Sequence, residues 1–160
     1  MYRVQCNYYT LTRLVMKLDE ITVHVKPGFF IGELKLGMSK SEIDKVTQNY
    51  PFFLKFEYQD GKCSFIDLFS SAEIKFVCLY EEFDLFNTKA SVLIPLIDNI
   101  SPYDRDKSDG YSYYFPEIGL SFWRDMNLTE ENMQEHWFKD MSPENQEDTA
   151  KHLYFGAVGV

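Results

Sequence analysis

The chain has 160 residues, and its hydrophobic fraction of 45% with 17% aromatic residues supplies enough apolar area for one core, which excludes global disorder. Its 25 acidic and 16 basic residues give a net charge of -9, which disfavours nucleic acid and anionic membranes as partners and favours a basic protein. No apolar stretch approaches the roughly 20 residues of a membrane span, and no signal peptide is evident, so we expect a cytoplasmic protein.

The three cysteines, Cys6, Cys63 and Cys78, have no C-x-x-C spacing and no nearby ligands for zinc. We therefore expect reduced core thiols, no metal and no cofactor. Residues 1–27 are expected to form an N-terminal extension and a first strand. Residues 28–160 are expected to form a single α+β domain, whose one core includes that strand.

The first elements carry clear local signals. Residues 20–25 alternate apolar and polar side chains, which predicts a strand with one buried face. Ser39 followed three residues later by Glu42 is a capping box, and it predicts a helix that runs to about Gln48.

Three β-rich runs follow this helix. Asp60 and Gly61 separate residues 52–58 from residues 62–69, and an Asp-Gly pair between such runs predicts a β-hairpin. Residues 73–80 predict another strand. We expect these three strands to form an antiparallel meander.

The second half begins with an apolar helix predicted over residues 89–99, capped by Thr88 and interrupted by Pro95. Its expected buried face consists of Val92, Leu93, Leu96 and Ile97. Residues 100–110 are rich in Ser, Pro, Asp and Gly, so they predict an exposed loop.

The remaining elements are a hairpin, two short helices and a closing strand. The hairpin is predicted over residues 111–124, and a helix capped by Thr129 over residues 130–139. A second helix of one or two turns follows Ser142, and the strand is predicted over residues 153–158. The expected fold class is α+β, with a single curved antiparallel sheet and a few packed helices.

No pattern in the chain indicates catalysis. The nucleophile elbow, the P-loop and the H-E-x-x-H motif are absent, and the three histidines have no partner at a diagnostic spacing. The acid pairs Glu81–Glu82 and Glu130–Glu131 are sequence neighbours, whose side chains point in different directions. We therefore expect no enzyme, although an unobvious acid pair stays open as an alternative.

Negative charge is concentrated in the C-terminal third, where nine acidic residues between Glu117 and Asp148 face only Arg124 and Lys139. Exposed acids beside outward aromatic side chains are typical of a protein-binding patch. The candidate binding residues are Asp104, Asp106, Asp109, Tyr111, Tyr113, Glu130, Glu131 and Glu135.

Three stretches resemble small bacterial immunity proteins, the cytoplasmic partners of polymorphic toxins that include those of contact-dependent growth inhibition. They are residues 31–39 (IGELKLGMS) followed by Glu42, the aromatic hairpin with Tyr80 and Phe86 after it, and residues 114–124 (YFPEIGLSFWR). The resemblance covers residues 28–158.

The resemblance implies an antitoxin that forms a one-to-one complex with the C-terminal domain of a cognate toxin, often a basic nuclease, and occludes its active or substrate-binding surface. Immunity proteins share no catalytic residues, so the candidate binding residues rest on charge and expected exposure alone. The alternative is a non-catalytic adaptor or structural subunit of a bacterial complex, which a large exposed apolar patch would favour.

Overall fold

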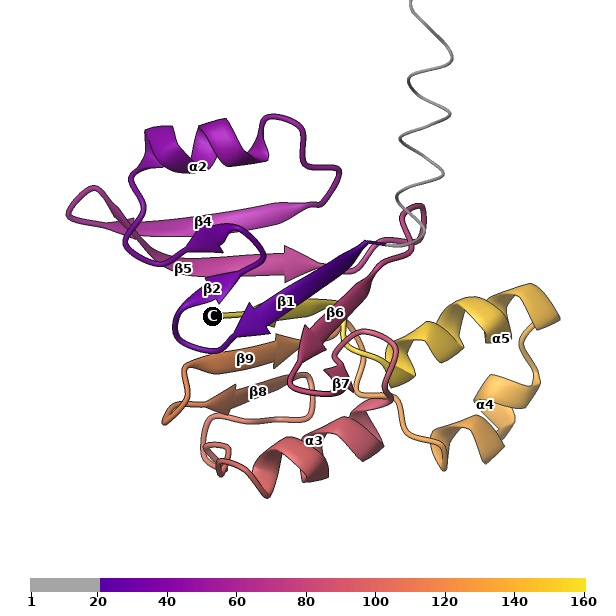
Figure 1. Cartoon of the computed structure of the whole chain (residues 1–160). Coiled ribbons are helices and arrows are strands. Elements are labelled where there is room, and N and C mark those ends of the chain that lie inside the picture. Colours follow the sequence, from indigo (N-terminus) through magenta and orange to yellow (C-terminus); the bar gives the residue numbers. More distant parts are fainter. Residues whose placement is uncertain (1–20) are drawn as a thin grey trace, which may run out of the picture.

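The computed structural model describes residues 21–160, and they form two five-stranded sheets with four α-helices (Figure 1). The expected mixture of helices and strands is confirmed, but the expected single curved sheet is wrong. The proposed extension before residue 21 lies outside the described residues.

The first sheet joins two short hairpins through a parallel pair of strands. Its order is β3 (Leu34–Lys35), β2 (Phe30–Ile31), β1 (Thr22–Lys26), β6 (Val77–Tyr80) and β7 (Phe83–Asp84). Strand β6 runs parallel to β1, with Val23 opposite Cys78. The predicted meander is therefore wrong, because the chain leaves the hairpin after β5 and crosses to the other sheet before β6 begins.

The second sheet is antiparallel throughout. Its order is β4 (Leu54–Gln59), β5 (Lys62–Phe69), β10 (Ala157–Gly159), β9 (Leu120–Trp123) and β8 (Ser112–Phe115). The β4–β5 hairpin confirms its Asp-Gly signal: Asp60 and Gly61 have φ values of 50° and 74°, as a type I′ turn requires. The predicted closing strand becomes β10, which lies inside the sheet.

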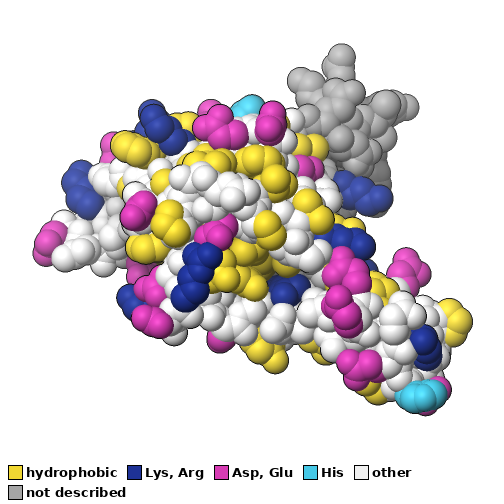
Figure 2. Space-filling model, turned by 90° about the horizontal axis from the view of Figure 1, so that it is seen from below, with side chains coloured by type: hydrophobic (Ala, Val, Ile, Leu, Met, Phe, Trp, Pro, Cys, Tyr) yellow, Lys and Arg dark blue, Asp and Glu magenta, His cyan; other side chains and the backbone are white. Residues whose placement is uncertain are grey.

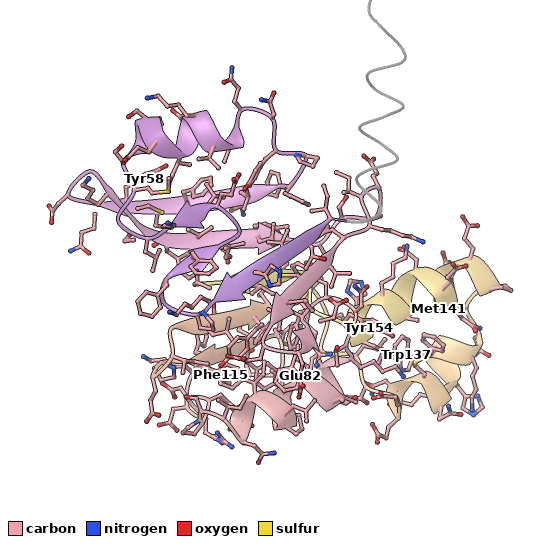
Figure 3. All side chains as sticks on the ribbon, in the orientation of Figure 1. Tyr58, Glu82, Phe115, Trp137, Met141 and Tyr154 are labelled. Atoms are coloured by element: carbon pink, nitrogen blue, oxygen red, sulfur yellow. The ribbon has the colours of Figure 1, made fainter. Side chains whose placement is uncertain are left out.

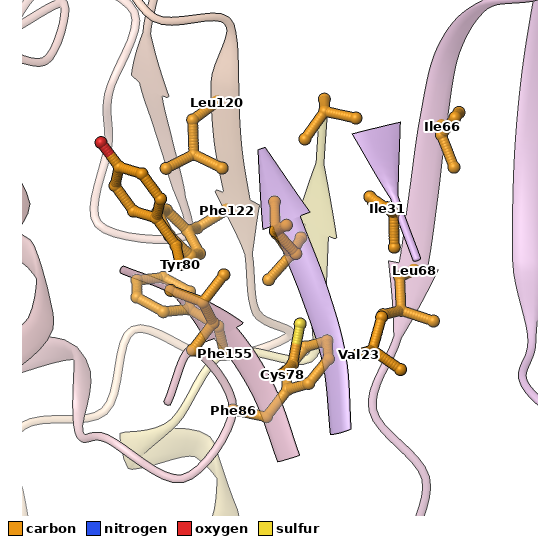
Figure 4. Close-up of a cluster of buried hydrophobic side chains, with 14 of the residues drawn as sticks. Val23, Ile31, Ile66, Leu68, Cys78, Tyr80, Phe86, Leu120, Phe122 and Phe155 are labelled. Atoms are coloured by element: carbon orange, nitrogen blue, oxygen red, sulfur yellow. The ribbon is translucent and has the colours of Figure 1, made fainter. Parts of the chain in front are cut away.

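The core fills the space between the two sheets (Figure 4). Val23 and Cys78 from the first sheet pack in one cluster with Ile66 and Phe122 from the second, because alternate residues of each strand face inward. The cysteine prediction is confirmed for Cys63 and Cys78, which are free and buried, and burial raises the pKa of Cys78 to about 12. Cys6 lies outside the described residues.

The helices stand at the margins of the sheets in Figure 1. They are α2 (Lys40–Thr47), α3 (Ala90–Asp98), α4 (His136–Lys139) and α5 (Pro143–Ala150), with short 3₁₀ segments η1 (Asn132–Gln134) and η2 (Lys151–Leu153). The capping box of α2 is confirmed: Ser39 N donates to Glu42 Oε2 at 2.7 Å, and Glu42 N donates to Ser39 Oγ at 3.4 Å.

Two helix predictions need correction. The N-cap of α3 is Lys89, without a side-chain cap, so the predicted cap at Thr88 is wrong. The predicted helix over 130–139 is broken into η1 and α4, because Glu135 adopts an extended backbone with ψ of 156°. The N-cap of η1 is Glu131, without a side-chain cap, so the predicted cap at Thr129 is also wrong. Thr129 Oγ1 instead accepts a local hydrogen bond from Asn132 N at 3.3 Å.

Candidate functional site

The most strongly charged part of the described chain is a segment that we call the acidic lobe, residues 125–151, which carries η1, α4 and α5. It contains eight carboxylates and only two basic side chains, Lys139 and Lys151. Seven of the eight carboxylates are exposed, and Glu130 is half-buried. Figure 2 shows acidic side chains gathered over this lobe, at the right of the view.

Arg124, the base just before the lobe, is buried, with only 4% of the residue exposed. Its guanidinium donates to Gly110 O at 2.9 Å, Leu128 O at 3.0 Å, His152 O at 3.1 Å and Asn127 Oδ1 at 2.6 Å. It also lies 5.6 Å from the centre of the Phe155 ring. Burial lowers the pKa of Arg124. Arg124 thus fixes both ends of the acidic lobe to the second sheet.

Of the three predicted acids in the 104–109 loop, Asp104 and Asp109 stabilise turns of the backbone, and Asp106 does not. Asp104 Oδ1 accepts hydrogen bonds from the backbone N–H groups of Asp106 and Lys107 at 3.0 and 3.2 Å. Asp109 Oδ1 accepts from those of Tyr111 and Ser112 at 3.0 and 2.8 Å. Asp106 is exposed, so it is the member of this group whose carboxylate is most available to a partner.

The two predicted tyrosines differ in orientation. Tyr111 is exposed, as expected. Tyr113 is partly buried against the core, where its ring centre lies 5.2 Å from that of Tyr103 and 5.9 Å from that of Phe155. The prediction of an outward Tyr113 is wrong, because on strand β8 it is Tyr114 that faces solvent and Tyr113 that alternates inward.

The three predicted glutamates lie along the first part of the acidic lobe. Glu130 accepts a hydrogen bond from Ser91 Oγ at 2.9 Å and pairs with Lys89 at 3.5 Å. Bonds from its own backbone N–H and from Ser91 lower the pKa of Glu130. Glu135 accepts from Trp137 Nε1 at 2.9 Å, and Glu131 is exposed.

Helix α3 separates these two groups. Glu130 contacts its first turn through Ser91, whereas Asp98 in its last turn binds Arg105 of the 104–109 loop through two bonds of 2.7 and 2.6 Å. A helix of nine residues is about 13 Å long. The structure therefore places Glu130 at the first turn of α3 and the 104–109 loop at its last turn.

The face of α3 between these ends is apolar and exposed. The buried residues of the helix are Ala90, Leu93, Ile94 and Ile97, so the predicted inward orientation of Val92 and Leu96 is wrong. Val92 is 50% exposed, Leu96 38%, and Ile100 just beyond the helix 52%. We call these three residues the α3 stripe. Helix α3 lies on the lower side of the molecule in Figure 1, and Figure 2 views that side, with apolar side chains near the centre of the view.

A second apolar feature lies within the acidic lobe. Trp137 of α4 is 40% exposed, and its ring centre lies 5.8 Å from that of the buried Phe138. Met141 lies between α4 and α5, where Thr149 Oγ1 is 3.6 Å from its sulfur (Figure 3). The lobe therefore combines carboxylates with an aromatic side chain that is open to a partner.

Two grooves on the described surface do not bring carboxylates together. A groove of about 980 Å³ between Phe76, Phe86 and Tyr154 is lined by one carboxylate, Glu147, and another of about 310 Å³ is lined by Glu33. The acid pair that a glycosidase needs is not present among either set of lining residues.

Within residues 21–160 no group of three or more His, Cys, Asp or Glu side chains could hold a metal ion. In the same range no helix has the length and apolar character to cross a membrane. Burial raises the pKa of Asp67, but this side chain lies on the open face of β5 beside Lys55 and Glu57. Asp67 is therefore not part of an enclosed acid pair.

No protein family, curated protein or solved structure matches the chain.

Sequence reasoning found the acidic residues from charge alone, but it missed Arg124 and the exposed side of α3. An arginine beside a predicted strand gives no sign of burial, and an all-apolar helix gives no sign of which face is covered. The function is inferred from the charges and contacts of the chain's own residues.

Proposed function

We propose that the protein is an immunity protein, which binds a cognate bacterial toxin domain in the cytoplasm as a one-to-one complex and neutralises it. The acidic lobe carries this proposal. Its eight carboxylates outnumber its two lysines, and they remain in large excess when the buried neighbour Arg124 is counted. Such a surface favours a strongly basic partner.

A toxin that cleaves nucleic acid must present a cationic cleft to its substrate. The acidic lobe and Asp106 would steer such a domain into contact, since complementary fields raise association rates well above those of neutral pairs. Binding over the cleft would then exclude the substrate. Trp137 and Tyr111 are exposed aromatic side chains near these acids in the sequence, and they are suited to be anchors of the complex.

An adaptor or structural subunit of a bacterial complex is the second candidate. The α3 stripe favours it, because exposed apolar side chains in a row mark a surface for protein contact whatever the partner does. The two candidates differ in outcome: an immunity protein abolishes the activity of its partner, whereas an adaptor leaves it intact.

The test is co-expression with the toxin domain encoded beside this gene, followed by purification and measurement of growth and affinity at increasing salt. We expect a one-to-one complex that restores growth and weakens as salt rises. Asp106→Lys, Asp125→Lys and Glu131→Lys together should slow association by at least about tenfold. These three carboxylates are exposed, and none of them accepts a hydrogen bond that supports a turn.

The matched control reverses three other exposed acids, in the variant Asp44→Lys, Glu57→Lys and Glu117→Lys. It changes the net charge by the same amount but leaves the acidic lobe and the 104–109 loop intact. Equal effects of the two triple variants would mean that overall charge, and not this surface, governs association. A neighbouring domain that neither binds nor loses toxicity would refute the immunity function.

A further inference from the structure

Helix α3 is apolar on the side that faces solvent as well as on the side that faces the core. Ala90, Leu93, Ile94 and Ile97 supply the buried side. The outer side has two rows along the axis: Ser91, Pro95 and Asn99, and beside them the α3 stripe of Val92, Leu96 and Ile100. Neither row contains a charged residue, and Asp98 is the only charge in the helix.

This composition is unusual for a helix at a protein surface. An exposed helix normally carries charged side chains on its outer face, and a helix that is apolar all round is normally buried. In this chain 26% of residues are charged, and α2 has Lys40, Glu42, Asp44 and Lys45 within a single helix. The outer side of α3 is therefore suited to being covered by another surface.

The charges at the two ends of α3 distinguish between possible occupants. Near its first turn lie Glu130 and Glu131 with Lys89, and near its last turn lie Asp98, Asp104 and Asp106 with Arg105 and Lys107. Each end thus has one more carboxylate than bases. A second copy packed antiparallel on α3 would bring one acidic end against the other, which is repulsive.

We propose that the α3 stripe binds an amphipathic helix of a protein partner, whose apolar residues lie on the stripe and whose lysines or arginines lie at its acidic ends. This inference rests on the proposed binding of a basic protein and adds the element that is recognised. Charge complementarity selects this occupant over a second copy of the chain. In this proposal α3 forms the contact from which water is excluded, and the acidic lobe attracts the partner from a distance.

The spacing of the stripe matches this occupant. Val92, Leu96 and Ile100 are four residues apart, so their side chains form a ridge about 12 Å long on the helix surface. Ridges of this kind pack into the groove between the side-chain rows of a second helix. The exposed residues Glu131 and Asp106 lie beyond the two ends of the stripe. They would therefore be near the two ends of a bound helical segment of about two turns.

The first experiment titrates the isotope-labelled full chain with two synthetic peptides of about 18 residues, long enough to form a helix. Both contain the same leucines and lysines. In one peptide the leucines repeat at helical spacing, and in the other they are distributed around the helix. We expect the amphipathic peptide to shift the NMR resonances of α3 and to bind at least about tenfold more tightly than its isomer.

Leu96→Asp should remove that preference. Phe29→Asp should preserve it, because Phe29 is even more accessible, at 60% exposure against 38% for Leu96, but lies outside α3. Equal binding of the two peptides, shifts that avoid α3, or an unchanged preference in Leu96→Asp would each overturn the inference. Because Leu96 is partly exposed, its replacement should leave the core intact. Unchanged NMR resonances of core residues would show that the variant is folded.

The complex with the neighbouring toxin domain separates this inference from the proposed function. If Leu96→Asp weakens that complex at least about tenfold although it adds a carboxylate facing a basic partner, the stripe is the contact surface. If reversal of Asp106, Asp125 and Glu131 weakens the complex but Leu96→Asp does not, the immunity function stands and the role of the stripe is refuted. If the toxin domain does not bind at all, the immunity function falls, and the peptide titration still decides what α3 binds.

Discussion

Helices α3 and α5 are nearly equal in length, nine and eight residues, but they present opposite surfaces to solvent. Four residues of α3 are buried, and its outer side is uncharged. No residue of α5 is buried, and its sequence PENQEDTA is almost entirely polar. The helix with the firmest attachment to the core is thus the one with the more apolar exposed surface.

This difference separates two tasks in binding. Charges on α5 and in the rest of the acidic lobe act over a distance of about 8 Å in physiological salt and affect mainly the rate of association. Apolar side chains on α3 act only on contact, and they affect mainly the rate of dissociation. A surface of each kind on one molecule allows the two rates to be changed independently.

The largest expected effect follows from detaching the lobe that carries α5. Arg124→Met should lower the free energy of unfolding by about 4 kcal/mol, because it leaves the carbonyl groups of Gly110, Leu128 and His152 without their donor. Urea unfolding followed by circular dichroism measures this loss. Arg124→Lys should also be strongly destabilising, since one ammonium group cannot reach three separate segments.

The control for this prediction is an arginine that is paired on the surface. Arg105 also makes two hydrogen bonds to a carboxylate and stacks on Tyr103, with its Cζ 3.7 Å from the ring centre, but half of its side chain is exposed. Arg105→Met should therefore cost much less than Arg124→Met. Equal losses for the two variants would mean that Arg124 does not hold the lobe.

The next effect compares the two sides of α3. Leu93 is fully buried, so Leu93→Ala should cost about 3 kcal/mol through lost contacts and the cavity that remains. Leu96 is 38% exposed, and Leu96→Ala should change stability by less than about 1 kcal/mol. The same urea titration measures both variants. Similar losses would show that the stripe packs inside the monomer and is not free to bind.

The sequence predicted best the features that depend on neighbouring residues. The Ser39–Glu42 capping box, the turn at Asp60 and Gly61, and the Ser142 cap of α5 all form as expected, because each needs only a few side-chain and backbone atoms close together. Acid-rich segments were also recognisable, since charged residues are rarely buried unless they are paired.

Features that depend on distant residues were not predictable in this way. Strand β6 has the same alternation whether it pairs with β5 or with β1, so its parallel pairing with β1 had no local signal. Val92 and Leu96 are as apolar as Leu93 and Ile97, so periodicity could not tell which side of α3 is buried. Tyr113 and Tyr114 required the register of β8 to be known.

A smaller effect is expected at the start of α5, where stability depends on a cap instead of on packing. Ser142 Oγ accepts a hydrogen bond from Asn145 N at 3.3 Å, and Ser142→Ala should cost about 1 kcal/mol. Ser142→Asp should retain most of this stability, because an aspartate also caps a helix and its charge suits the N-terminus. Helix α3 has no side-chain cap to lose, so it has no counterpart of this dependence.

The smallest effect concerns Asp98, the only charged residue of α3, and it depends on pH. The hydrogen bond from Arg105 is the largest cause that holds the pKa of Asp98 below its usual value. A carboxyl of this kind stabilises the folded state at pH values above its unfolded pKa of about 3.9, and the stabilisation is lost as the pH falls through the lower folded pKa. Arg105→Gln should therefore be less stable than the wild type at pH 7, by an amount that decreases in acid. The part of the difference that survives below both pKa values reports the other contacts of Arg105 with Tyr103. These are the stacking, with Cζ 3.7 Å from the ring centre, and the hydrogen bond to Tyr103 O at 2.8 Å. Urea unfolding of both proteins across this pH range measures the two parts, and a difference that does not change with pH would mean that the ion pair contributes nothing to holding the 104–109 loop against α3.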